Sequence, residues 1–177
     1  MGGESAVDTA TAVVNLVDKV CTLVKSNTVV TMPEFASALP PGVDPNQVAS
    51  WEGWSSTPQS LTDPILYEVN LPGFSNTSFS LGVRFNWGGM LPGQPFSYVK
   101  DLEAFVILNS VTLVHDLDID VKFAKTGTPI TQDHTVMLTG SFNVKVSHKL
   151  LGPEFSDFYA IRVFGNGAAQ IAQQQQS

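Results

Sequence analysis

Segments in which apolar and polar residues alternate recur through most of the chain after residue 60. In residues 63–71, every second residue from Ile65 to Leu71 is apolar. Because successive side chains of a β-strand point to opposite faces, this pattern predicts a half-buried strand. Similar or fully apolar runs occupy residues 78–88, 103–114, 117–124, 140–148 and 157–164. Strands at this spacing, separated by Gly- and Pro-rich breaks, predict an all-β, antiparallel β sandwich.

The rest of the chain suggests an arm and a tail around one sandwich domain. Residues 6–25 carry apolar residues at helical spacing, which predicts an N-terminal helix lying outside the sandwich. A proline-rich connector follows, so we assign residues 1–49 to a helical or extended arm and connector. The sandwich is expected at residues 50–166. The Gln-rich residues 167–177 are expected to form a flexible tail.

Composition favours a subunit that is buried against others. Hydrophobic residues make up 43% of the 177 residues and charged residues 14%, against roughly 25% charged residues in a typical domain. The net charge is -7 and no basic cluster occurs, which argues against autonomous binding to nucleic acid. No apolar run reaches the roughly 18 residues of a membrane-spanning helix. We therefore expect oligomerisation and no membrane partner.

Catalytic motifs are missing from the sequence. The three histidines, His115, His134 and His148, do not have the compact spacing of metal ligands, and no nucleophile elbow, P-loop or dinucleotide-binding motif occurs. The single cysteine, Cys21, lies among apolar residues, so it is interpreted as a packed side chain. We expect no enzyme activity, no cofactor and no resident metal.

The alternating aspartates Asp116, Asp118 and Asp120 are the best candidate for a polar site. On a strand all three carboxylates leave the same face, about 7 Å apart. That spacing is too wide for one cation unless another segment helps. A solvated strand face is the favoured interpretation. The alternative is a Ca²⁺ ion at a subunit interface, or a Lys or Arg partner from a neighbouring subunit.

Four stretches resemble the jelly-roll capsid proteins of picorna-like viruses. They are WEGW (51–54), TDPILYEVNLPG (62–73), MLPGQPFSYVKDLEAFVILNS (90–110) and VTLVHDLDIDVKFAKTGTP (111–129). The chain is most similar to a small coat protein of plant viruses that build their shell from three coat proteins, the cheravirus type of secovirid. The resemblance covers about half of the chain.

This resemblance implies a jelly-roll sandwich that assembles with other coat proteins into an icosahedral shell around an RNA genome. The RNA is enclosed with weak direct binding, and the chain is expected in the virion after assembly in the host cytoplasm. It also implies that large aromatic residues pack at or beneath subunit contacts. The candidates are Trp51, Trp54, Trp87, Phe96 and Tyr98.

A second function remains open, namely a ligand- or carbohydrate-binding β-sandwich module. Such a module needs exposed aromatic rings, and Trp51, Trp54 and Trp87 could form that platform. Oligomeric behaviour separates the two functions, because a binding module is expected to be a soluble monomer and a shell subunit is not.

Overall fold

The computed structural model describes residues 12–16, 20–25, 27–33, 35–67, 76–150 and 154–174. These residues form twelve strands and one short 3-10 helix. In chain order the elements are β1 (Ala12–Leu16), β2 (Val20–Lys25), β3 (Thr28–Pro33), β4 (Ala36–Leu39), η1 (Pro45–Ser50), β5 (Gln59–Tyr67), β6 (Thr77–Met90), β7 (Ser97–Ser110), β8 (His115–Phe123), β9 (Thr126–Ile130), β10 (Thr135–His148), β11 (Glu154–Phe164) and β12 (Ala169–Gln174).

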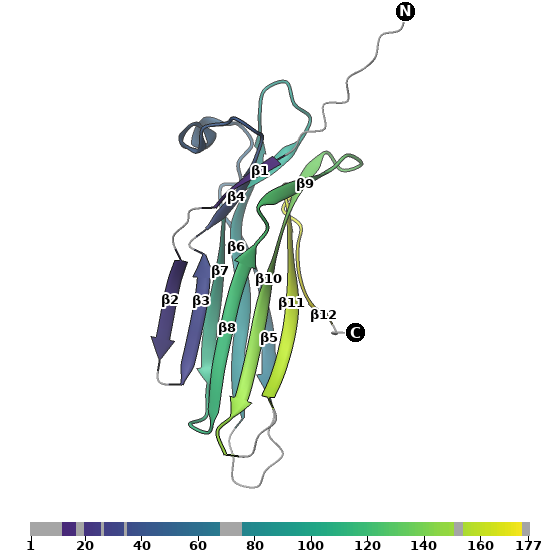
Figure 1. Cartoon of the computed structure of the whole chain (residues 1–177). Coiled ribbons are helices and arrows are strands. Elements are labelled where there is room, and N and C mark those ends of the chain that lie inside the picture. The colour runs from purple at the N-terminus through teal and green to yellow at the C-terminus, as the bar shows by residue number, and fades with distance from the viewer. Residues whose placement is uncertain are drawn as a thin grey trace, which may run out of the picture.

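The strands form an all-β sandwich of two layers (Figure 1). One layer contains β5, β6 and β7, and the other contains β2, β3, β8, β10, β11 and β12. The short strands β1, β4 and β9 connect the layers at one end, so that a continuous hydrogen-bonded path runs through both. β5, β6 and β7 are antiparallel neighbours, and β4 returns beside β7. These four strands therefore have the spatial order of a Greek key.

The core lies between the two layers and follows the alternating pattern of the sequence. On β8, for example, Leu117, Ile119 and Val121 are buried, whereas Asp116 and Asp118 are exposed. On β11 the residues from Tyr159 to Val163 alternate in the same way, whereas on β6 all residues from Phe79 to Val83 are buried. β7 and β8 confirm strands within the ranges expected at residues 103–114 and 117–124, although β7 ends at Ser110 and β8 at Phe123. The expected strand at 63–71 begins earlier, at Gln59, and its last four residues lie outside the described residues.

The expectation of an N-terminal helix is wrong. Residues 12–16 and 20–25 are strands, of which β1 pairs with both β4 and β9 and β2 pairs with β3. The β-branched valines of this segment are the physical reason, because they lose side-chain freedom in a helix and suit a pleated surface. β1 is thus part of the sheet and not an arm beside it. Cys21 lies in β2.

The expectation of a flexible tail is also wrong for residues 169–174. They form β12, which pairs with β11 from Val163↔Ala169 to Phe158↔Gln174. Two observations explain this strand. Ala169 and Ile171 pack against the core. The turn before the strand has Gly165 and Asn166 at its centre, closed by the N–H of Gly167 donating to the carbonyl of Phe164 at 3.0 Å, with Gly167 at φ +89°.

Candidate functional site

Trp51 and Trp54 attach the segment between β4 and β5, residues 40–58 and below called the connector, to the sheet. The connector contains η1, whose first turn is capped by Asp44: its Oδ1 accepts a hydrogen bond from the backbone N–H of Asn46 at 2.9 Å. The indole Nε1 of Trp54 donates to the carbonyl of Val48 at 2.7 Å. The rings of Trp51 and Trp54 stack, with centroids 6.2 Å apart and planes 12° apart. The connector is therefore fixed by its own two tryptophans.

The Trp54 ring is covered by the sheet as well as by Trp51. Lys100 Nζ lies 4.6 Å from the ring centroid, a cation–π distance. Gly89 contacts the ring so closely that a Cβ at this position would lie 2.2 Å from its atoms. Trp51 also meets Tyr98 edge to face at 5.6 Å. The structure thus brings three of the five aromatic candidates, Trp51, Trp54 and Tyr98, into one cluster.

Trp87 and Phe96 have other neighbours. Trp87 is partly buried and packs against the turn at Gly167. Its carbonyl accepts a hydrogen bond from the backbone N–H of Ser55 at 2.8 Å, and its own N–H donates to the Ser55 hydroxyl at 3.3 Å. Phe96 is buried and meets the ring of His134 edge to face at 6.2 Å. A role of these residues at a subunit contact stays a prediction.

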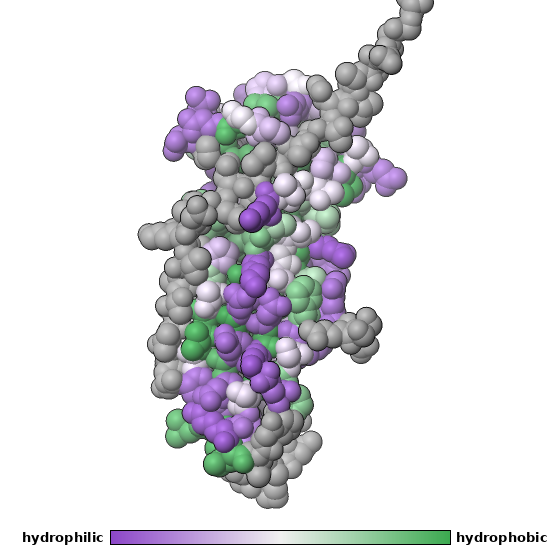
Figure 2. Space-filling model, in the orientation of Figure 1, coloured by the Kyte–Doolittle hydropathy of each residue, from purple (hydrophilic) through white to green (hydrophobic). Residues whose placement is uncertain are grey.

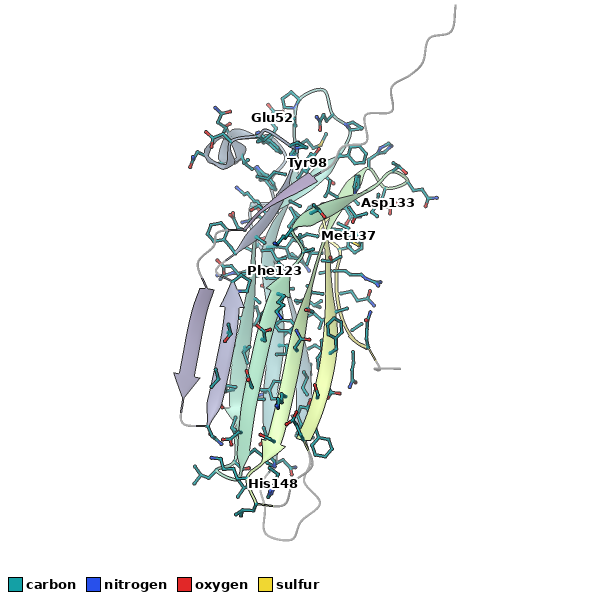
Figure 3. All side chains as sticks on the ribbon, in the orientation of Figure 1. Glu52, Tyr98, Phe123, Asp133, Met137 and His148 are labelled. Atoms are coloured by element: carbon teal, nitrogen blue, oxygen red, sulfur yellow. The ribbon has the colours of Figure 1, made fainter. Side chains whose placement is uncertain are left out.

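Tyr98 is a core residue. Its side chain is buried, its hydroxyl donates to Gln94 Oε1 at 2.7 Å, and burial raises its pKa. Figure 3 places it at the same end of the sandwich as Glu52, opposite His148.

Asp116, Asp118 and Asp120 leave the same outer face of β8, as predicted. Asp116 pairs with Lys149 at 3.1 Å and Asp120 with Lys122 at 2.9 Å, while Asp118 lies opposite Lys145 in the β8–β10 register. For Asp116 and Asp120 the basic partners therefore come from this chain, while Lys145 forms its ion pair with Glu154 at 2.9 Å. In the part of the chain that the structure describes, no three His, Cys, Asp or Glu side chains are arranged to hold a metal ion.

Two of the histidines, His115 and His148, meet at the end of the sandwich opposite Tyr98. His115 is only 2% exposed, and its Nδ1 lies 2.6 Å from the hydroxyl of Thr77. Its ring contacts that of His148 edge to face, with centroids 5.4 Å apart. Burial lowers the pKa of His115, and the nearby His148 lowers it further. His134 lies away from this pair, in the turn between β9 and β10.

The same end exposes large apolar side chains that the sequence analysis did not select. Leu113 is 82% exposed in the β7–β8 turn and Leu150 is 70% exposed after β10. The two turns are joined, because the N–H of Lys149 donates to the carbonyl of Val114 at 2.9 Å. Figure 2 shows hydrophobic side chains gathered at this end. We call Leu113 and Leu150 the apolar end.

Comparisons with known proteins give no relative for this chain: no family model, no curated protein and no solved structure matches it significantly. Among the residues described, no helix has the length and hydrophobicity needed to cross a membrane.

Proposed function

We propose that this chain is a structural coat protein that assembles with other coat proteins into an icosahedral shell enclosing an RNA genome. In this proposal it has no enzyme activity, it is a component of the virion, and it assembles in the host cytoplasm. The net charge of -7 is compatible with a subunit that encloses RNA while binding it weakly.

The apolar end is the observation that supports this proposal most. Leucines exposed by 82% and 70% on two joined turns lose contact with water when another protein covers them. Turns at the end of a sandwich can form such contacts without disturbing the core. The low share of charged residues, 14%, supports the same conclusion for the whole surface.

We also propose the finer fold, a jelly roll. A jelly roll contains two Greek keys, and the order β4-β7-β6-β5 supplies one of them. The competing function, a sugar- or ligand-binding module, finds less support. A stacking platform needs a free ring face, and Trp54 is contacted by Trp51, Lys100 and Gly89.

The test is to replace both leucines of the apolar end, Leu113→Ser with Leu150→Ser, and to measure the assembled fraction by sedimentation and negative-stain microscopy. Since exposed side chains add little to the fold, we expect an unchanged circular dichroism spectrum. The assembled fraction should fall by about tenfold, as when contact residues of an interface are removed.

Ile107→Ser is the matched control, because Ile107 is 48% exposed on β7, away from the two turns. This variant is expected to assemble like the parent. Equal assembly of the double variant and the parent would remove the main support for the proposal.

A further inference from the structure

The two layers leave an open seam where β5 faces β11 and β12. Among the described strands, β5 pairs with β6 alone, so its other edge has no strand partner. β12 packs near β5 but is hydrogen-bonded to β11 only, again within the described strands. Backbone N–H and C=O groups along such an edge are available to another chain.

Side chains from the three strands meet across this seam. The hydroxyl of Tyr67 on β5 donates to Asp157 Oδ2 on β11 at 2.5 Å. Gln173 Nε2 on β12 donates to Asp157 Oδ1 at 3.1 Å. A carboxylate offers about four acceptor sites, so Asp157 keeps acceptor capacity on both oxygens.

A groove of about 300 Å³ lies beside these hydrogen bonds. Its lining includes Asp63, Leu66, Tyr67, Asp157, Tyr159 and Gln173. The groove thus holds two carboxylates, and among the described residues no Lys or Arg lines it. Burial raises the pKa of Tyr159 to about 12, with Asp157 and Asp63 adding to the effect. The hydrogen bond with Tyr67 acts in the opposite direction and lowers the pKa of Tyr159. The groove therefore carries two carboxylates without a cationic partner among its described lining residues.

We propose that this groove is a docking site for an extended segment of a partner protein that carries an arginine. The guanidinium group lies between Asp63 and Asp157, and an apolar residue of the segment covers Leu66, which is 60% exposed. Arginine fits better than lysine, because its planar group donates two parallel hydrogen bonds to a carboxylate and loses water more readily. The proposal does not depend on whether the chain builds a shell.

Protection of the β5 edge against pairing is the alternative to docking, and it predicts a different effect of mutating Asp63. Asp63 points inward on an edge strand and Pro64 lacks an N–H, and both features protect edges against pairing. If protection is their only role, Asp63→Asn should increase self-association, and the groove should show no preference for arginine.

The experiment uses two fluorescein-labelled peptides, Thr-Leu-Arg-Val-Thr and the same peptide with citrulline, the neutral isostere of arginine. Binding to the full chain is measured by fluorescence anisotropy at low and moderate salt. We expect the arginine peptide to bind at least about tenfold more tightly and to weaken as salt is added. Equal binding of the two peptides, or no binding of either, overturns the proposal.

Variants then locate the site. Asp63→Asn and Asp157→Asn should each remove the preference for arginine, whereas Asp133→Asn should retain it. Asp133→Asn removes the same charge, but Asp133 lies in an exposed turn outside the groove. Circular dichroism is recorded for each variant to show that it is folded. If a folded Asp63→Asn variant keeps the full preference for arginine, the proposed site is wrong.

Discussion

The imidazole of His115 lies in the interior of the sandwich, where the fold favours its neutral form. The side chain is 2% exposed and borders His148 and Thr77. Its pKa is lowered by burial and then by His148, so it lies below the value of about 6.5 expected in the unfolded chain. In mildly acidic solution the unfolded state therefore binds more protons than the folded state, and acid weakens the fold.

We predict from this that the free energy of unfolding falls as pH decreases from about 7 to 5, measured by urea denaturation at several pH values. The stabilisation from His115 is complete above its pKa in the unfolded state. It is lost as the pH falls through its lower pKa in the folded state. His115→Gln removes the titrating group and should flatten this dependence. His134→Asn is the control, since His134 is exposed and Asn tolerates its φ of +46°. A parent chain equally stable at pH 7 and 5 would contradict the argument.

Gly88 is a residue whose replacement should be costly for two separate reasons. Its φ is +91°, and a Cβ would lie 2.4 Å from the carbonyl oxygen of Gly53 in the connector. Gly93 has a similar φ of +84° but nothing within 4 Å. In chemical denaturation we expect Gly93→Ala to lose about 1 kcal/mol through backbone strain, and Gly88→Ala about 3 kcal/mol through strain and collision. If Gly88→Ala and Gly93→Ala lose the same free energy of unfolding, the close approach of Gly88 to Gly53 does not contribute to the cost.

At the scale of elements, alternation was the reliable signal and helical spacing was not. β8 and β11 could be predicted because one face of each strand is buried and the other is solvated. The valine-rich N-terminal segment is compatible with the helical period as well as with a strand. It forms a strand because β1 pairs with β4 and β9. For β12 the missed signal was Gly165-Asn166-Gly167, a short loop with a glycine in the left-handed position, before Ala169 and Ile171.

β12 gives a prediction at this scale. Deleting residues 169–177 removes the strand partner of β11 and the packing of Ala169 and Ile171 on the core. We expect a loss of about 2–4 kcal/mol in the free energy of unfolding, comparable to removing a buried apolar side chain. Aggregation should also increase, because the deletion leaves the edge of β11 bare. Deleting only residues 175–177 should change little. If both deletions behave alike, β12 does not contribute to the stability of the fold.

At the scale of the whole molecule, surfaces built from distant segments were the least predictable part. The five aromatic candidates could be selected by residue type, but the meeting of Trp51, Trp54 and Tyr98 depends on how the connector crosses the sheet. The apolar end and the seam at Asp63 and Asp157 join turns and strands far apart in the chain. Alternation of apolar and polar residues determines which face of a strand is buried. It does not determine which strands become neighbours.

The central claim, that this chain is a shell subunit, is tested most directly by sedimentation velocity of the purified chain over a range of concentrations. The exposed apolar end and the low content of charged residues predict assemblies that sediment much faster than a 19.0 kDa monomer, or material that stays soluble only with partner chains. A sharp, stable monomer boundary at tens of micromolar would contradict the claim and favour a binding module.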